Sequence, residues 1–134
     1  CGTGVLTCGI AKHYKDVIGV DNNEDAIADA TLNAKANNVQ VDFYCRDVID
    51  FLLEQKNDNV TVVVDPPRQG LSPRVIDTLV KLEPKQIIYV SCYPDTLGRD
   101  LRLFTEGGYA VKTVQPVDMF LHTPHIEAVV ILQK

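Results

Sequence analysis

The sequence predicts an α/β fold in which helices cover a mostly parallel β-sheet. Short segments rich in β-branched residues alternate with longer segments whose apolar residues recur at helical spacing. Repetition of this kind is typical of β-α-β units and a parallel sheet. The last two apolar segments are instead joined by residues 116–127, which contain two prolines and no helical pattern. Such a link suits an antiparallel pair, so we expect an antiparallel C-terminal strand.

The first half of the chain contains an initial helix followed by two strand–helix pairs. Before the second of these helices, Asn22 or Asn23 can serve as the N-cap, because an asparagine oxygen accepts bonds from free N–H groups of the first turn. The predicted elements are a helix at 4–14, a strand at Val17–Asp21, a helix at Glu24–Asn37, a strand at Gln40–Cys45 and a short helix at Val48–Gln55.

The second half continues the alternation and ends in two strands. The run of β-branched residues in Asn59–Asp65 predicts a strand buried on both faces. Ser72 and Pro73 form a helix start, and Gly107 with Gly108 forms a helix end. The predicted elements are a strand at 59–65, a helix at Pro73–Leu82, a buried strand at Gln86–Cys92, a helix at Pro94–Gly107 and strands at Tyr109–Gln115 and Ala128–Gln133.

Composition points to one soluble globular domain. The chain has 134 residues, of which 46% are hydrophobic and 23% charged. No apolar run reaches transmembrane length, and we find no signal peptide. The net charge of −5 argues against this segment alone gripping a nucleic acid backbone, which lysine and arginine would have to do. The charge does not exclude a nucleic acid substrate that another domain holds.

The four cysteines, at positions 1, 8, 45 and 92, include no pair with CxxC spacing. That spacing argues against a zinc or iron–sulfur site built from this chain. A chain with this much core also has no need of a disulfide framework. We expect reduced thiols in a cytoplasmic protein without a membrane segment.

The chain opens directly at Cys1-Gly2-Thr3-Gly4, with no strand before the glycines. A turn of this type normally follows a strand. We therefore expect residues 1–134 to be the C-terminal piece of a longer protein, with the first central strand of the sheet missing from this chain.

Gly2, Gly4, Asp21 and Asp47 predict a site for an adenosine-containing cofactor. The two glycines precede a helix, and the two acids follow successive predicted strands. An acid roughly 20 residues after such a turn suits the hydroxyls of a ribose, and the next acid could face an adenine amino group. NAD and S-adenosylmethionine both fit. Thr7 occupies the position of the third glycine of a dinucleotide fingerprint, which favours S-adenosylmethionine because it has no phosphate to cradle.

Asp65, Cys92 and Glu127 predict a chemical site at one edge of the sheet. The first two end predicted parallel strands, and an antiparallel last strand would start at that same edge, which brings Glu127 to it. The helix after Cys92 favours thiolate over thiol. The plainer readings are a small buried hydrophobe for Cys92, a cap for Asp65 and an exposed strand-opening charge for Glu127.

Three segments carry unusual residue combinations. They read Val-Asp-Pro-Pro-Arg-Gln-Gly-Leu at 64–71, Tyr-Val-Ser-Cys-Tyr-Pro at 89–94 and Met-Phe-Leu-His-Thr-Pro-His-Ile-Glu at 119–127. Together they resemble the motifs of the RNA uracil-C5 methyltransferases, which use S-adenosylmethionine. Leu121 and Tyr93 depart from the usual Pro and Asn of the family. The resemblance implies a Rossmann-like class I methyltransferase sheet and methyl transfer to C5 of a uridine in RNA. It also implies Cys92 as nucleophile through a covalent adduct at uracil C6, and Glu127 as base.

By the same resemblance, Asp65 lies between the cofactor and the pocket for the base, and Gly2, Gly4, Asp21 and Asp47 hold S-adenosylmethionine. Family members usually carry an N-terminal RNA-binding domain, so the RNA partner would be held mainly outside this chain. The motifs look closer to the ribosomal RNA branch than to the transfer RNA branch. Two alternatives are an RNA cytosine-C5 methyltransferase, disfavoured because Arg68 stands where those enzymes have cysteine, and a noncatalytic α/β binding module.

Overall fold

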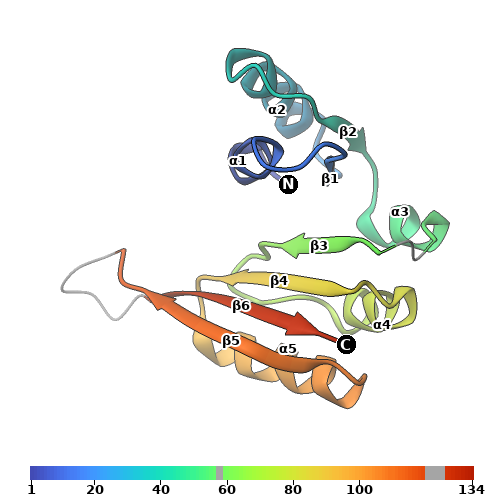
Figure 1. Ribbon diagram of the computed structural model, residues 1–134, viewed down its shortest axis with the longest axis vertical. Coiled ribbons are helices and arrows are strands. Elements are labelled where there is room, and N and C mark those ends of the chain that lie inside the picture. Colours follow the sequence, from blue (N-terminus) through green and yellow to red (C-terminus); the bar gives the residue numbers. More distant parts are fainter. Residues whose placement is uncertain (57–58, 120–125) are drawn as a thin grey trace. The chain divides into compact units, whose positions relative to one another are not determined.

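The computed structural model describes residues 1–56, 59–119 and 126–134, which form two compact units, Cys1–Glu54 and Gln55–Lys134 (Figure 1). No helix among the described residues is both long enough and apolar enough to cross a membrane. All eleven predicted helices and strands are present at or near their expected positions. The boundaries differ by a few residues at most, because end residues fray or belong to turns.

The first unit contains a two-stranded parallel sheet and three helices. Its elements are α1 (Val5–Ala11), β1 (Ile18–Asp21), α2 (Glu24–Ala36), β2 (Asp42–Cys45) and α3 (Val48–Glu54). Asp21 pairs with Cys45 at the carboxyl end of the ladder, so both strands end at the same level. Asn23 caps α2, its side-chain oxygen accepting bonds from the Asp25 and Ala26 N–H groups at 2.9 and 3.1 Å. This confirms the second of the two predicted caps.

The second unit contains a four-stranded mixed sheet with two helices. Its elements are β3 (Thr61–Val64), α4 (Pro73–Leu82), β4 (Gln86–Ser91), α5 (Pro94–Glu106), β5 (Ala110–Val117) and β6 (Glu127–Gln133). The strand order is β3-β4-β6-β5, with β3 parallel to β4 and β6 antiparallel to both of its neighbours (Figure 1). The predicted antiparallel C-terminal strand is confirmed. The sequence did not predict that β6 would lie between β4 and β5.

The core of the second unit lies on one face of its sheet. Burial alternates along β4 and β6, with Ile87, Tyr89, Val130 and Leu132 fully buried. Helices α4 and α5 contact each other and supply apolar side chains to the same core, among them Leu79 and Phe104. The prediction that the strand at 59–65 is buried on both faces is wrong, whereas the strand predicted as buried at Gln86–Cys92 does carry fully buried residues. Residues of β3 are half-buried or exposed and those of β4 alternate, as expected for a sheet packed on one face.

Candidate active site

Cys92 and Glu127 lie across from each other at one end of the antiparallel ladder. Ser91, the last residue of β4, pairs with Ala128 of β6. Cys92 follows Ser91 and Glu127 precedes Ala128, so both lie one step beyond this pair in adjacent chain segments. Each is half-buried. The edge predicted to carry both the thiol and the second carboxylate is therefore confirmed.

Two hydrogen bonds of the Ser91 side chain fix the turn that carries Cys92. The Ser91 hydroxyl accepts a hydrogen bond from the Tyr93 N–H and donates one to the Tyr93 carbonyl, both at 3.1 Å. Ser91 is buried, so these bonds are shielded from competing water. The backbone on both sides of Cys92 is thereby fixed, and α5 begins two residues later at Pro94. Sequence reasoning did not assign this role to Ser91.

Asp65 lies at the same edge, on the parallel neighbour of β4. Val64 ends β3 and pairs with Tyr89, so Asp65 follows at nearly the level at which β4 ends. Its side chain is exposed. The structure therefore brings Asp65, Cys92 and Glu127 to one edge of one sheet, as predicted from the sequence.

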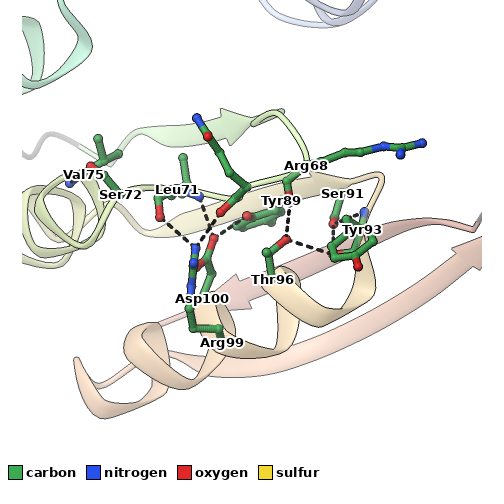
Figure 2. A network of polar contacts seen from close by, with 11 residues as sticks. Arg68, Leu71, Ser72, Val75, Tyr89, Ser91, Tyr93, Thr96, Arg99 and Asp100 are labelled. Carbon is green, nitrogen blue, oxygen red and sulfur yellow. Dashed lines mark hydrogen bonds and ion pairs between the residues drawn. The ribbon is translucent and has the colours of Figure 1, made fainter.

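The loop after Asp65 is fastened to α5 through a buried carboxylate, Asp100 (Figure 2). Asp100 is 0% exposed and receives hydrogen bonds from the Tyr89 hydroxyl at 2.6 Å and the Leu71 N–H at 2.8 Å. The Arg99 guanidinium donates to its other oxygen at 2.6 and 2.8 Å. A buried carboxylate is costly unless it is paired and fully hydrogen-bonded, and here both oxygens have partners. Burial, together with the hydrogen bond to Asp100 and its charge, raises the pKa of Tyr89 well above its usual value.

Gly70 allows the loop to approach this network closely. Its φ of +75° is strained for any residue with a side chain, and a Cβ there would lie 2.6 Å from the Asp100 carboxylate. The Gly70 N–H donates to the Pro67 carbonyl at 2.8 Å, which closes a tight turn. The Arg99 guanidinium also donates to the Gln69 and Leu71 carbonyls at 2.9 and 3.1 Å. The path of the chain after Asp65 is therefore fixed on two sides.

Asp100 is the main residue of this region that sequence reasoning missed. In α5 it lies between Leu97 and Phe104 on the buried stripe, three and four residues away from them. A carboxylate on the apolar stripe of an amphipathic helix signals a buried, paired group. That signal was available in the sequence.

In the first unit, the glycine turn and Asp21 are joined directly. The Gly2 N–H donates to the Asp21 carboxylate at 2.8 Å, and the nitrogen of Cys1 does so at 2.9 Å. The Asn23 N–H binds the other carboxylate oxygen at 3.1 Å. Partial burial acts to raise the pKa of Asp21, whereas the hydrogen bonds from the Gly2 and Asn23 N–H groups act to lower it. Asp21 thus shapes the turn that the sequence placed beside the cofactor.

The glycines of the turn have different surroundings. Gly2, at a φ of +52°, is exposed, and a Cβ there would meet nothing within 4 Å. Gly4, at +77°, is buried, and a Cβ there would lie 2.8 Å from the Ala30 Cβ of α2. The second glycine therefore serves close helix packing, whereas the first leaves open space beside the Asp21 carboxylate.

Asp47 caps α3. One of its carboxylate oxygens accepts bonds from the Ile49 and Asp50 N–H groups at 2.8 and 3.3 Å. The residue is exposed and lies two positions after β2, at the sheet end where Asp21 closes β1. Gly2, Asp21 and Asp47 therefore gather at the carboxyl end of the first unit's sheet, the usual ligand edge of open α/β sheets. Open space beside Gly2 and a carboxylate that can accept bonds from ribose hydroxyls fit an adenosine-containing group.

Comparison with known protein families gives two matches. A model described as tRNA (uracil-5-)-methyltransferase matches residues 46–134, and a general methyltransferase domain model matches residues 1–78. An uncharacterized RNA methyltransferase of Enterococcus faecalis is 44% identical over all of this chain, which covers 30% of that protein. Another, from Caldanaerobacter subterraneus, is 45% identical with the same coverage. The chain thus spans about a third of the length of the curated relatives it matches.

Solved structures give a similar result. The Pyrococcus abyssi tRNA (uracil-54, C5)-methyltransferase, determined with S-adenosyl-L-homocysteine, superposes with a TM-score of 0.84 at 39% identity. The match covers 98% of this chain and 32% of that one. The magnesium protoporphyrin IX methyltransferase of Synechocystis, also with S-adenosylhomocysteine, gives a TM-score of 0.76 at 17% identity over 100% of this chain and 71% of its own. The second likeness confirms the predicted Rossmann-like methyltransferase fold, and nothing more.

Proposed function

Because the chain belongs to the tRNA (uracil-5-)-methyltransferase family, we propose that its parent protein methylates C5 of a uridine in RNA. The supporting observation is the register that sets Cys92 opposite Glu127, one step beyond the Ser91–Ala128 pair. A nucleophile and a base at adjacent strand ends are what substitution at a poorly reactive aromatic carbon requires. Residues 1–134 act in this proposal as one methyltransferase domain.

Cys92 starts the reaction. Its thiolate adds to C6 of the uracil, and the electron pair of the C5–C6 double bond moves into the ring as an enolate with charge at C5. The hydrogen bonds of the Ser91 hydroxyl fix the backbone next to Cys92. In this proposal the backbone therefore needs no rearrangement before the sulfur attacks.

Glu127 finishes the reaction. After C5 has gained the methyl group, the Glu127 carboxylate takes the C5 proton. The electron pair left behind restores the C5–C6 double bond and expels the Cys92 thiolate. The enzyme returns to its starting state when Glu127 releases the proton to solvent. Asp65 accepts a hydrogen bond from the uracil edge at the same sheet edge.

S-adenosylmethionine, when bound, supplies an electrophilic methyl group. In this proposal Gly2 and Gly4 form the turn beside it, Asp21 accepts bonds from its ribose hydroxyls and Asp47 faces its adenine amino group. Asp65 contacts both this group and the uracil. Asp21 retains acceptor capacity for this role, because each carboxylate oxygen can accept two hydrogen bonds.

The RNA partner stays a prediction. The motifs favour ribosomal RNA, whereas the matching family model and the Pyrococcus enzyme are both named for transfer RNA. An RNA base buried in folded RNA must be splayed out to reach such a site. Segments of the parent protein outside this chain would hold the RNA in a cytoplasmic enzyme. Part of the third motif, residues 120–125, lies outside the described residues.

The experiment is methyl transfer from labelled S-adenosylmethionine by the full-length protein to in vitro transcripts of tRNA and of 23S rRNA, tested in parallel. Digestion to nucleosides followed by mass spectrometry should give 5-methyluridine from one transcript class. Labelled 5-methylcytidine would overturn the choice of uracil, and no labelled nucleoside from either class would overturn the activity.

A further inference from the structure

The hydroxyl of Thr96 joins the two loops that leave the active-site edge. It lies 2.9 Å from the Arg68 carbonyl, in the loop after Asp65, and 3.2 Å from the Tyr93 carbonyl, next to Cys92 (Figure 2). A threonine hydroxyl has one hydrogen, so the two carbonyls share it. The Arg68 and Tyr93 backbones are therefore held side by side.

Both backbones are also fixed on their other sides. The buried Ser91 hydroxyl bonds the N–H and the carbonyl of Tyr93. Arg99, anchored on buried Asp100, bonds the carbonyl of Gln69, the neighbour of Arg68. Backbone held this firmly loses little further entropy when a ligand binds, so only the two side chains remain to be ordered.

The side chains of Arg68 and Tyr93 are available to a ligand. Tyr93 is 39% exposed, and Arg68 is exposed. With the residues that the structure describes, the Arg68 guanidinium forms no ion pair or hydrogen bond, unlike Arg99, Arg46 and Arg102. In Figure 2 the Arg68 side chain extends away from the Asp100 network, toward Ser91 at the end of β4 and Tyr93 just beyond it. An exposed aromatic ring and a guanidinium without a partner among the described residues thus lie on the two loops that Thr96 joins.

We propose that Arg68 and Tyr93 form a flanking-nucleotide subsite that holds the unpaired nucleotide next to the target uridine. The Tyr93 ring stacks on the base of that nucleotide, and the Arg68 guanidinium binds its phosphate. Stacking on aromatic rings and guanidinium contacts to phosphate are how proteins hold unpaired RNA. The inference deepens the proposed function and rests on it. It gives this acidic chain a local contact with RNA even though its overall charge opposes one.

The test is steady-state methylation of the transcript class that the full-length wild-type protein modifies, with Arg68→Ala, Tyr93→Ala and two matched variants. Tyr93→Phe keeps the ring. Lys85→Ala removes one positive charge just before β4, at the strand end opposite Cys92. Tyr93→Ala should raise KM for RNA roughly 5- to 100-fold, and Arg68→Ala about 10-fold. In both, kcat should stay near the wild-type value, because the contact is made equally before and during the chemical step.

Salt dependence separates a phosphate contact from a structural effect. Arg68→Ala should lower the slope of log affinity against log salt by about 0.7, the value for one phosphate contact on a single strand. Tyr93→Ala, Tyr93→Phe and Lys85→Ala should leave that slope unchanged, and the last two should keep the wild-type KM. Wild-type KM in both alanine variants would overturn the subsite while leaving the proposed function intact. Absence of methylation by the wild-type protein would instead overturn the proposed function.

Discussion

Replacing Tyr89 by phenylalanine removes one hydroxyl from the Asp100 network and leaves the ring in place. That hydroxyl donates to a carboxylate that is 0% exposed, at 2.6 Å. A hydrogen bond to a charged group contributes about 1.5–3 kcal/mol, and the variant leaves an acceptor site of a buried charge empty. We expect Tyr89→Phe to lower the free energy of unfolding by about 2 kcal/mol.

The same substitution elsewhere gives two internal references. Tyr109 is also buried, but its hydroxyl donates to the neutral Pro84 carbonyl at 2.8 Å, so Tyr109→Phe should cost about 1 kcal/mol. Tyr14 is 60% exposed, so Tyr14→Phe should change stability by less than about 0.5 kcal/mol. All three variants lose one oxygen atom from the same side chain. The differences between their losses of unfolding free energy therefore depend on the partner of each hydroxyl and on its burial.

Equilibrium urea unfolding measures the series. With a slope of about 1–3 kcal/mol/M, the Tyr89→Phe midpoint should fall by about 0.7–2 M at unchanged slope. The order of loss should be Tyr89, then Tyr109, then Tyr14. A Tyr89→Phe loss no larger than that of Tyr109→Phe would refute the reasoning, since the charge of Asp100 would then add nothing to the bond.

Other variants test the same account. Gly70→Ala should destabilise by about 1–3 kcal/mol in urea unfolding, because φ is +75° and the new Cβ would lie 2.6 Å from Asp100. Gly98→Ala, inside α5 with nothing within 4 Å of its Cβ, should stabilise by about 0.5–1 kcal/mol; equal signs for the two would contradict this. Burial and the charge of Glu83 raise the pKa of Tyr109 to about 12. Above pH 10 the unfolded chain therefore binds fewer protons than the folded one, so stability should fall between pH 10 and 12, and less steeply in Tyr109→Phe. Glu127→Gln should retain methylated RNA as a covalent adduct on ordinary uridine, visible on denaturing gels, whereas Glu106→Gln, an exposed acid of α5, should turn over normally.

Periodicity and turn residues predicted the elements well, because local sequence decides them. Ser72 before Pro73 and the helix-free link after Pro116 are signals contained within a few residues. The placement of β6 between β4 and β5 was not predictable in this way, since antiparallel pairing alone does not say on which side a strand joins a sheet. Burial of β3 was overestimated because β-branched content reports strand propensity and does not report what covers each face.

The residues of the candidate site also fall into those that local sequence predicted and those that it did not. Asp65, Cys92 and Glu127 were found because each stands at the end of a strand that the sequence reveals. Thr96 and Arg99 were missed because their partners lie about 28 to 30 residues away, at backbone atoms that no side-chain pattern encodes. Asp100 was missed although its place on the apolar stripe of α5 is visible in the sequence. Asp21 and Asp47 were found as acids after strands, but their bonds to the glycine turn and to the start of α3 emerge only in the folded chain.

The most direct test of the central claim is a covalent trap. The full-length protein is incubated with S-adenosylmethionine and RNA that contains 5-fluorouridine, and adducts that survive denaturation are then measured. Fluorine cannot leave C5 as a cation, so the bond between the Cys92 sulfur and C6 should persist. We predict an adduct in the wild-type protein, none in Cys92→Ala and an undiminished one in Cys45→Ala, a free thiol in the first unit. An adduct that persists in Cys92→Ala, or no adduct in a wild-type protein that still binds the RNA, would contradict the account.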